Sequence, residues 1–91
     1  MKKITLVTTK GCTGCNIMEY NIKQALKEVN KDNSILFERI DAETFGKKAI
    51  RTFNITDFPT ILLFKDDNLK LKYVGSMPII VILRWIDVYF K

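Results

Sequence analysis

The order in which strand-like and helix-like apolar patterns follow one another constrains the fold of this chain more than any other feature. Short apolar runs predict strands, and apolar residues three and four positions apart predict helices. Turn residues such as Lys10-Gly11 and Gly75-Ser76 separate the runs. In chain order the pattern predicts a strand over Ile4–Thr8, a helix from Cys12 or Thr13 to about Asn30, a strand over Ser34–Asp41, a helix from about Thr44 to Phe53, strands over Thr60–Phe64 and Leu69–Val74, and a helix over Pro78–Tyr89.

These runs indicate an α/β fold in the order β-α-β-α-β-β-α. The preference for right-handed crossovers predicts a parallel pair of strands at the centre of the sheet, with the hairpin beside it. Lys70 and Lys72 on the last strand are typical of an exposed sheet edge. The expected buried faces of the first two helices consist of Cys15, Met18, Ile22, Leu26 and Val29, and of Phe45, Ala49, Ile50 and Phe53.

Length and composition exclude several classes of protein. The 91 residues leave room for a single domain, residues 1–91, and a hydrophobic content of 47% argues against disorder. The net charge of +5 is spread along the chain, whereas a nucleic-acid binder gathers its charge on one helix or arm. We therefore expect no nucleic-acid partner. Because the chain has no histidine, imidazole bases and histidine-rich metal sites are excluded.

A chemical role explains the two cysteines better than a disulfide that stabilises the fold. The apolar stretch near the start is too short for a signal-peptide core or a membrane span, so we expect a cytoplasmic protein with no membrane partner. Thiols stay reduced in that compartment. A bond between Cys12 and Cys15 would close a loop with only two intervening residues, which contributes little to stability.

The position of Cys12-Thr13-Gly14-Cys15, between a buried strand and a helix, predicts a reactive thiol. At the N-terminus of a helix, free N–H groups and the helix dipole lower the pKa of a thiol such as Cys12. Cys15 lies one turn further on, where it can attack a mixed disulfide formed at Cys12. Lys10 is a further positive charge near the pair.

Other interpretations of the cysteine pair remain open. Zinc needs about four ligands, so a metal site would require a second chain, and we expect none. An inert structural disulfide and a non-reactive pair are the remaining alternatives.

At this point the residues support a resemblance. From Ile4 to Tyr89 the chain resembles the thioredoxin-like superfamily, specifically its small thioredoxin or glutaredoxin-type members. The resemblance rests on the Cys12–Cys15 motif, on the run from Phe58-Pro59-Thr60 to Lys65, and on Val74-Gly75 before the last helix. It implies a four-stranded mixed sheet with helices on both faces.

The resemblance also implies how a substrate binds. Pro59 would follow a cis peptide bond and face the cysteine pair, and the backbone of Phe58 would pair with an extended substrate segment. A plain strand-opening proline is the alternative. The side chain of Phe58 would either contact substrate or fill the core. The positions to which the resemblance assigns substrate contact are Gly11, Thr13, Gly14, Phe58, Pro59 and Gly75.

The chain departs from the family pattern in places that bear on mechanism. Thioredoxins carry a buried carboxylate where this chain has Leu6, so the proton acceptor for Cys15 is open. Asp57 is either a partial substitute or an exposed loop residue. The Trp and Gly-Pro of thioredoxins are replaced by Gly11 and Thr13-Gly14. Since the Gly-Gly-x-x-Asp segment of glutaredoxins is also missing, a protein disulfide is a better expected partner than glutathione.

The last helix is apolar over most of its circumference. Only Arg84, Asp87 and Lys91 are polar after Pro78, and they cluster on one side. Burial in the core, a dimer or partner interface, and membrane contact are the alternatives.

The expected function is cytoplasmic thiol–disulfide exchange, with Cys12 as nucleophile and Cys15 as resolving thiol. No bound cofactor is needed, because the dithiol carries the two electrons. The expected electron donor is a thioredoxin reductase or glutathione, and the expected state is a monomer, with a weak dimer as the alternative. A binding subunit that docks a partner through the last helix is the alternative function.

Overall fold

A computed structural model describes residues 1–44 and 46–91 and contains the seven elements in the expected order. Their boundaries differ from the expected ones by at most three residues, and about half of them coincide. The elements are β1 (Lys2–Thr8), α1 (Thr13–Val29), β2 (Ile35–Asp41), α2 (Lys47–Phe53), β3 (Thr60–Lys65), β4 (Asn68–Val74) and α3 (Ile79–Tyr89).

The second helix begins later than expected, at Lys47 instead of Thr44. The carbonyl oxygen of Asp41 accepts the backbone N–H groups of Thr44 at 3.1 Å and Gly46 at 3.0 Å. These bonds hold the segment after β2 in a turn, so the helix starts only after Gly46. The expected burial of Phe45 lies outside the described residues.

The four strands lie in the order β2-β1-β3-β4. β1 runs parallel to β2 and antiparallel to β3, and β3 forms the hairpin with β4. The expectation of a parallel pair at the centre is therefore wrong, because the central pair β1–β3 is antiparallel and β2 is an edge strand. The crossover through α1 places β2 on one side of β1, which leaves the other side free for the hairpin.

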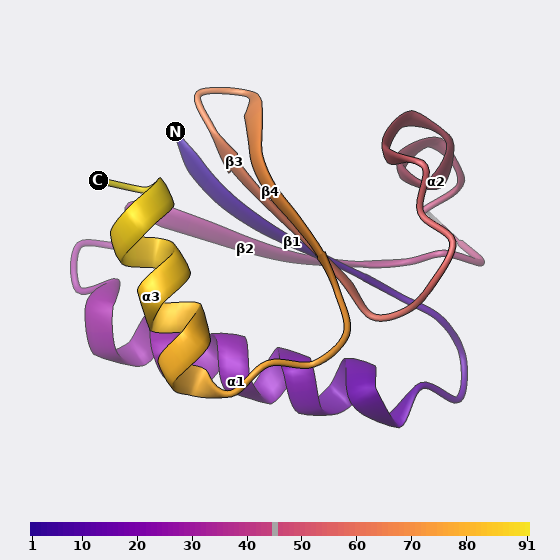
Figure 1. Ribbon diagram of the computed structural model, residues 1–91, viewed down its shortest axis with the longest axis horizontal. Helices are drawn as coiled ribbons and strands as arrows, with labels where there is room; N and C mark the ends of the chain where they lie inside the picture. Colours follow the sequence, from indigo (N-terminus) through magenta and orange to yellow (C-terminus); the bar gives the residue numbers. More distant parts are fainter. Residues whose placement is uncertain (45) are drawn as a thin grey trace.

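Helices cover both faces of the sheet, as expected. Figure 1 shows α1 and α3 together on one face and α2 alone on the other. The main core lies between the sheet and the α1/α3 layer, where alternate residues of β1, Ile4 and Leu6, meet α1 and α3. A smaller cluster of Val7, Ile55 and Leu62 packs against α2 and the loop after it.

Two of the expected buried faces need correction. Val29 is 45% exposed because it lies in the last turn of α1, where it lines an open hollow with Leu83 and Phe90, whereas Ala25 is fully buried. Leu26 packs against the core only partly. On α2 no described residue is fully buried, because this short helix rests on the edge of the smaller cluster with Ala49, Ile50 and Phe53 half-buried.

None of the helices described in residues 1–44 and 46–91 is both long and apolar enough to cross a membrane.

Candidate active site

The two cysteines meet at the start of α1. Cys12 is the N-cap of the helix, and its Sγ is bonded to that of Cys15, with 5.3 Å between the Cα atoms. The backbone N–H of Cys15 donates to Sγ of Cys12 at 3.1 Å. Cys15 is fully buried and Cys12 only partly. Cys12 is therefore the sulfur that an outside partner reaches first.

The start of α1 favours a negative charge on Cys12. The first turn of the helix contains no acidic residue, so its free N–H groups and its dipole are not neutralised there. A thiolate in such a position is stabilised relative to the thiol. Lys10 and Thr13, on either side, are exposed.

The loop before β3 packs against the cysteine turn. The peptide bond between Phe58 and Pro59 is cis, and Pro59 is buried. A Cβ atom on Gly14 would lie 3.4 Å from Cδ of Pro59 and 3.1 Å from Oγ of Ser76. A glycine therefore allows the close approach of these two loops to the turn between the cysteines.

The other predicted substrate contacts lie around this junction. The backbone N–H of Gly75 donates to the carbonyl of Pro59 at 2.8 Å, and Gly75 has a φ of 112°, which favours glycine. Gly11 has a φ of 67° and lies exposed just before Cys12. The side chain of Phe58 packs against Val7, Ile55 and Leu62, which agrees with core filling.

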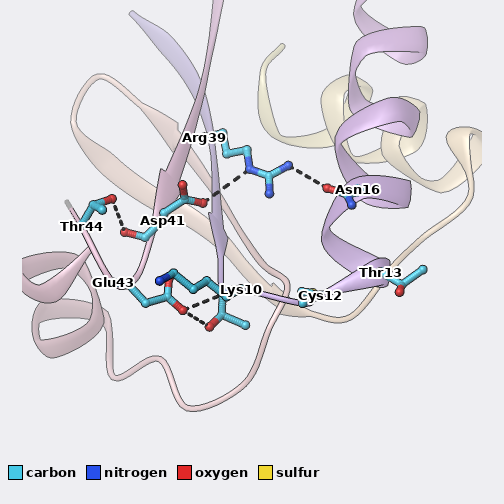
Figure 2. A pocket seen from close by; sticks show the side chains of 10 residues that line it. Lys10, Cys12, Thr13, Asn16, Arg39, Asp41, Glu43 and Thr44 are labelled. Carbon is cyan, nitrogen blue, oxygen red and sulfur yellow. Dashed lines mark hydrogen bonds and ion pairs between the residues drawn. The ribbon is translucent and has the colours of Figure 1, made fainter.

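Beside Cys12 the structure has a polar hollow that the sequence did not reveal. It has a volume of about 390 Å³ and lies between the loop after β1 and the end of β2. Figure 2 shows Arg39 between Asp41 and Asn16, with Glu43 against the loop after β1. The lining residues are Thr9, Lys10, Gly11, Cys12, Thr13, Asn16, Arg39, Asp41, Glu43 and Thr44.

Charge pairs hold the walls of this hollow together. Arg39 reaches Glu19 of α1 at 2.5 Å through Nη1, and its Nε lies 3.7 Å from Oδ1 of Asp41. Hydrogen bonds from Lys23 and Arg39 lower the pKa of Glu19. Glu43 accepts hydrogen bonds from the Thr9 hydroxyl and the Lys10 backbone N–H, which lower its pKa.

Sequence reasoning missed Arg39, Asp41 and Glu43, which line the hollow beside Cys12. The predicted parallel pair of strands was a signal that could have located them. The carboxyl ends of adjacent parallel strands meet at the same edge of a sheet. Thr8, the last residue of β1, is paired in register with Asp41, the last residue of β2.

The structure also locates the two residues discussed for proton transfer. Leu6 is fully buried in the main core. Asp57 is exposed in its loop, where the Thr56 hydroxyl donates to its Oδ2 at 3.0 Å. This position agrees with an ordinary loop aspartate.

Across residues 1–44 and 46–91, no three side chains of the metal-binding types lie close enough together to hold a metal ion. The candidate site consists of the Cys12–Cys15 disulfide, the proline loop and the polar hollow.

Comparison with known proteins gives one family match. The sequence profile described as Thioredoxin matches residues 2–88. No curated protein sequence matches this chain closely enough to serve as a relative.

Solved structures with the same fold are similar over most of the chain. Thioredoxin-2, described as a component of the malaria parasite protein secretion machinery, has a TM-score of 0.83 and 17% identity, over 96% of this chain and 82% of its own. Thioredoxin O2 from Arabidopsis thaliana, in the oxidised state, has a TM-score of 0.81 and 20% identity, over 100% and 76%. Oxidised mitochondrial thioredoxin 3 from Saccharomyces cerevisiae has a TM-score of 0.78 and 20% identity, over 96% and 78%.

Proposed function

The chain belongs to the thioredoxin family of disulfide oxidoreductases, and from that premise we propose that it reduces disulfide bonds of protein substrates. The observation that carries the proposal is the placement of the dithiol. Cys12 is partly exposed at the N-cap of α1, and Cys15 is fully buried one turn further on.

This placement assigns an order to the two thiols. In the reduced protein, the thiolate of Cys12 attacks one sulfur of a substrate disulfide, forms a mixed disulfide and displaces the other substrate sulfur as a thiolate. Cys15 then loses its proton and attacks Sγ of Cys12, which breaks the mixed disulfide and releases the second substrate thiol. The substrate gains two electrons, and the protein ends with the Cys12–Cys15 bond.

The proline loop supports the proposed mode of substrate binding. We assign an extended substrate segment to the backbone at Phe58, paired in the manner of an added strand. The packing of the Phe58 side chain on Val7, Ile55 and Leu62 fixes this backbone, and Gly75 is hydrogen-bonded to Pro59 beside it.

The setting of the reaction is also part of the proposal. The protein acts as a monomer in the cytoplasm and receives electrons from a thioredoxin reductase or from glutathione. The reductant direction follows from that reducing compartment.

Variants of the two cysteines test the mechanism. We expect Cys12→Ser to abolish reduction of an insulin-type protein disulfide, because no nucleophile remains. We expect Cys15→Ser to accumulate a mixed disulfide with the substrate, visible by non-reducing electrophoresis and mass spectrometry. Full multiple turnover by Cys15→Ser, without glutathione, would contradict the two-cysteine mechanism.

The redox equilibrium of the pair separates catalysis from a structural role. In defined glutathione or dithiothreitol buffers, we expect thiol trapping to give a reversible midpoint between about −180 and −270 mV, the range of known exchange proteins. A midpoint well below about −300 mV would identify a stable structural disulfide instead.

A second candidate function is a binding subunit that docks a partner through α3. The observation in its favour is that Ile80 and Val88 are 71% and 59% exposed. Trp85 is a poor test position, because its ring lies 5.2 Å from that of Tyr73. A stoichiometric partner that survives Cys12→Ser and is lost with Ile80→Glu would favour docking.

A further inference from the structure

The segment between β4 and α3 is bound to the first half of α1 by three hydrogen bonds. The hydroxyl of Ser76 donates to the carbonyl oxygen of Gly14 at 3.2 Å. The backbone N–H of Met77 donates to Sδ of Met18 at 3.4 Å, and its carbonyl oxygen accepts from Nδ2 of Asn21 at 2.9 Å. Figure 1 shows this segment passing along α1. Ser76 therefore has a fixed place beside the turn between the two cysteines.

The carbonyl group that Ser76 contacts belongs to the same peptide unit that donates a hydrogen bond to Cys12. In a trans peptide, the C=O of one residue and the N–H of the next point in opposite directions. The C=O of Gly14 is directed at Ser76, and the N–H of Cys15 is directed at Sγ of Cys12, 3.1 Å away. Hydrogen bonds in such a chain polarise one another, so the bond at the carbonyl makes the N–H a stronger donor.

The hydroxyl of Ser76 also fixes the orientation of this peptide unit. Glycine has more backbone freedom than any other residue, so Gly14 by itself does little to keep the N–H of Cys15 on the sulfur. Oγ of Ser76 lies 3.1 Å from the point where a Cβ atom of residue 14 would be. The absence of a side chain at Gly14 admits the hydroxyl, and the hydroxyl in turn restricts the rotation of the peptide.

The charged groups around Cys12 lie on other segments. The hollow that Cys12 lines also contains the side chains of Lys10, Arg39, Asp41 and Glu43. The segments that meet at the cysteine turn, residues 58–60 and 74–77, contain no charged residue, and Asp57 before them is exposed. A substitution at position 76 therefore leaves every charge around Cys12 in place.

We propose that Ser76 is a positioning residue, which keeps the N–H of Cys15 directed at Sγ of Cys12 and so stabilises the Cys12 thiolate of the reduced protein. This inference rests on the proposed function, in which that thiolate attacks the substrate disulfide. Ser76 acts through the peptide unit between Gly14 and Cys15. Because the thiolate is the nucleophile, a larger thiolate fraction at neutral pH makes the first step of exchange faster.

Alkylation of the reduced protein by iodoacetamide, with Cys12 followed by mass spectrometry, tests this role. At a pH well below the pKa of Cys12, the rate is proportional to the thiolate fraction. We expect Ser76→Ala to lower that rate about threefold, which is within the range that one hydrogen bond contributes. At a pH well above the pKa, where Cys12 is fully ionised, the variant and the wild type should react at nearly the same rate.

Matched variants separate the hydroxyl from the shape of the side chain. Ser76→Thr and Ser76→Val have side chains of nearly the same shape, and only the threonine has a hydroxyl. The threonine variant should keep the wild-type rate, and the valine variant should be as slow as Ser76→Ala. Ser34→Ala removes the hydroxyl of the other serine, beyond the far end of α1, and should change nothing. Circular dichroism checks that each variant folds.

Equal rates below the pKa in Ser76→Ala and the wild type would overturn the inference. So would a rate lowered by the same factor at every pH, because that result would mean altered access to Cys12 and not altered ionisation. If Ser76→Ala does not fold, equal rates in Ser76→Thr and Ser76→Val would have the same meaning. A wild-type protein that shows the Ser76 effect on alkylation but does not reduce protein disulfides would instead contradict the proposed function.

Discussion

At the scale of single residues, position 46 requires glycine because the structure leaves no room there for a side chain. Its backbone angles do not require glycine. Its φ of −92° is open to any residue. A Cβ atom at this position would lie 2.7 Å from Cα of Ala42 and 3.1 Å from the carbonyl oxygen of Asp41. Both neighbours are backbone atoms, which cannot move aside without shifting the turn. The turn also fixes the main chain of Asp41 beside the hollow.

We expect Gly46→Ala to lower the free energy of unfolding by about 1–3 kcal/mol, the usual cost of overpacking. Chemical denaturation followed by circular dichroism measures the change. Gly11→Ala is the matched control, because a Cβ atom there has no neighbour within 4 Å but the φ of 67° is strained. Its expected cost is about 1 kcal/mol. A loss below about 0.5 kcal/mol for Gly46→Ala would show that the turn yields easily, since changes of that size are typical of ordinary surface positions.

At the scale of elements, some isoleucines of α3 are buried in the core and another is exposed to solvent. Ile82 and Ile86 are 1% and 7% exposed, whereas Ile80 is 71% exposed. The helix packs against the sheet and α1 on one side only, so its wide apolar arc is covered only in part. The remaining apolar surface, at Ile80 and Val88, is what the docking alternative depends on.

We expect Ile82→Ala to lower the free energy of unfolding by about 2–5 kcal/mol, because it leaves a cavity in a closed core. Ile80→Ala, the same change two residues earlier, should cost less than about 0.5 kcal/mol. Urea denaturation of both variants measures the difference. Equal losses would mean that Ile80 is covered in solution, for example by a second molecule.

At the scale of the whole molecule, stability depends on carboxylates that remain charged. The pKa of Glu19 is lowered, first by its hydrogen bonds to Lys23 and Arg39, and the pKa values of Asp32, Glu43, Asp66 and Asp87 are lowered as well. A lowered pKa in the folded state adds stability at pH values above the unfolded pKa. That stability is lost as the pH falls through the folded value. Acid also leaves the charge of 15 Lys and Arg residues uncompensated.

We therefore expect the free energy of unfolding to fall as the pH is lowered from about 5 to 3, where carboxylates take up protons. In Glu19→Gln, the loss of unfolding free energy between about pH 5 and pH 3 should be smaller than in the wild type by about 0.5–1 kcal/mol. The expected change is small because the ion pairs of Glu19 lie near the surface. Urea denaturation at both pH values measures it. Glu28→Gln, on the same helix, is the control, because Glu28 forms no ion pair among the described residues. The same acid dependence in both variants would contradict a role for the Glu19 pairs.

The amino-acid sequence determined the features of this protein that depend on short stretches of chain. Apolar spacing over a few residues predicted all seven elements, and the strand–helix junction predicted Cys12 at the N-terminus of a helix. The family resemblance was confirmed. The roles of Gly11, Thr13, Gly14, Phe58, Pro59 and Gly75 toward a substrate stay predictions.

Tertiary structure decided whatever depends on residues far apart in the chain. The spacing of apolar residues predicts which face of a helix is buried, but it does not show how far along the helix the neighbouring elements extend. Val29 was therefore expected to be buried and is exposed. Neither periodicity nor the preference for right-handed crossovers ranks the pairings between distant strands, and the expected parallel pair at the centre was wrong. Asp41 lines the same hollow as Cys12 only because β1 and β2 pair in parallel register and end together. A carboxylate 29 positions from a cysteine carries no local signal of this arrangement, because the hollow that both residues line exists only once the sheet has formed.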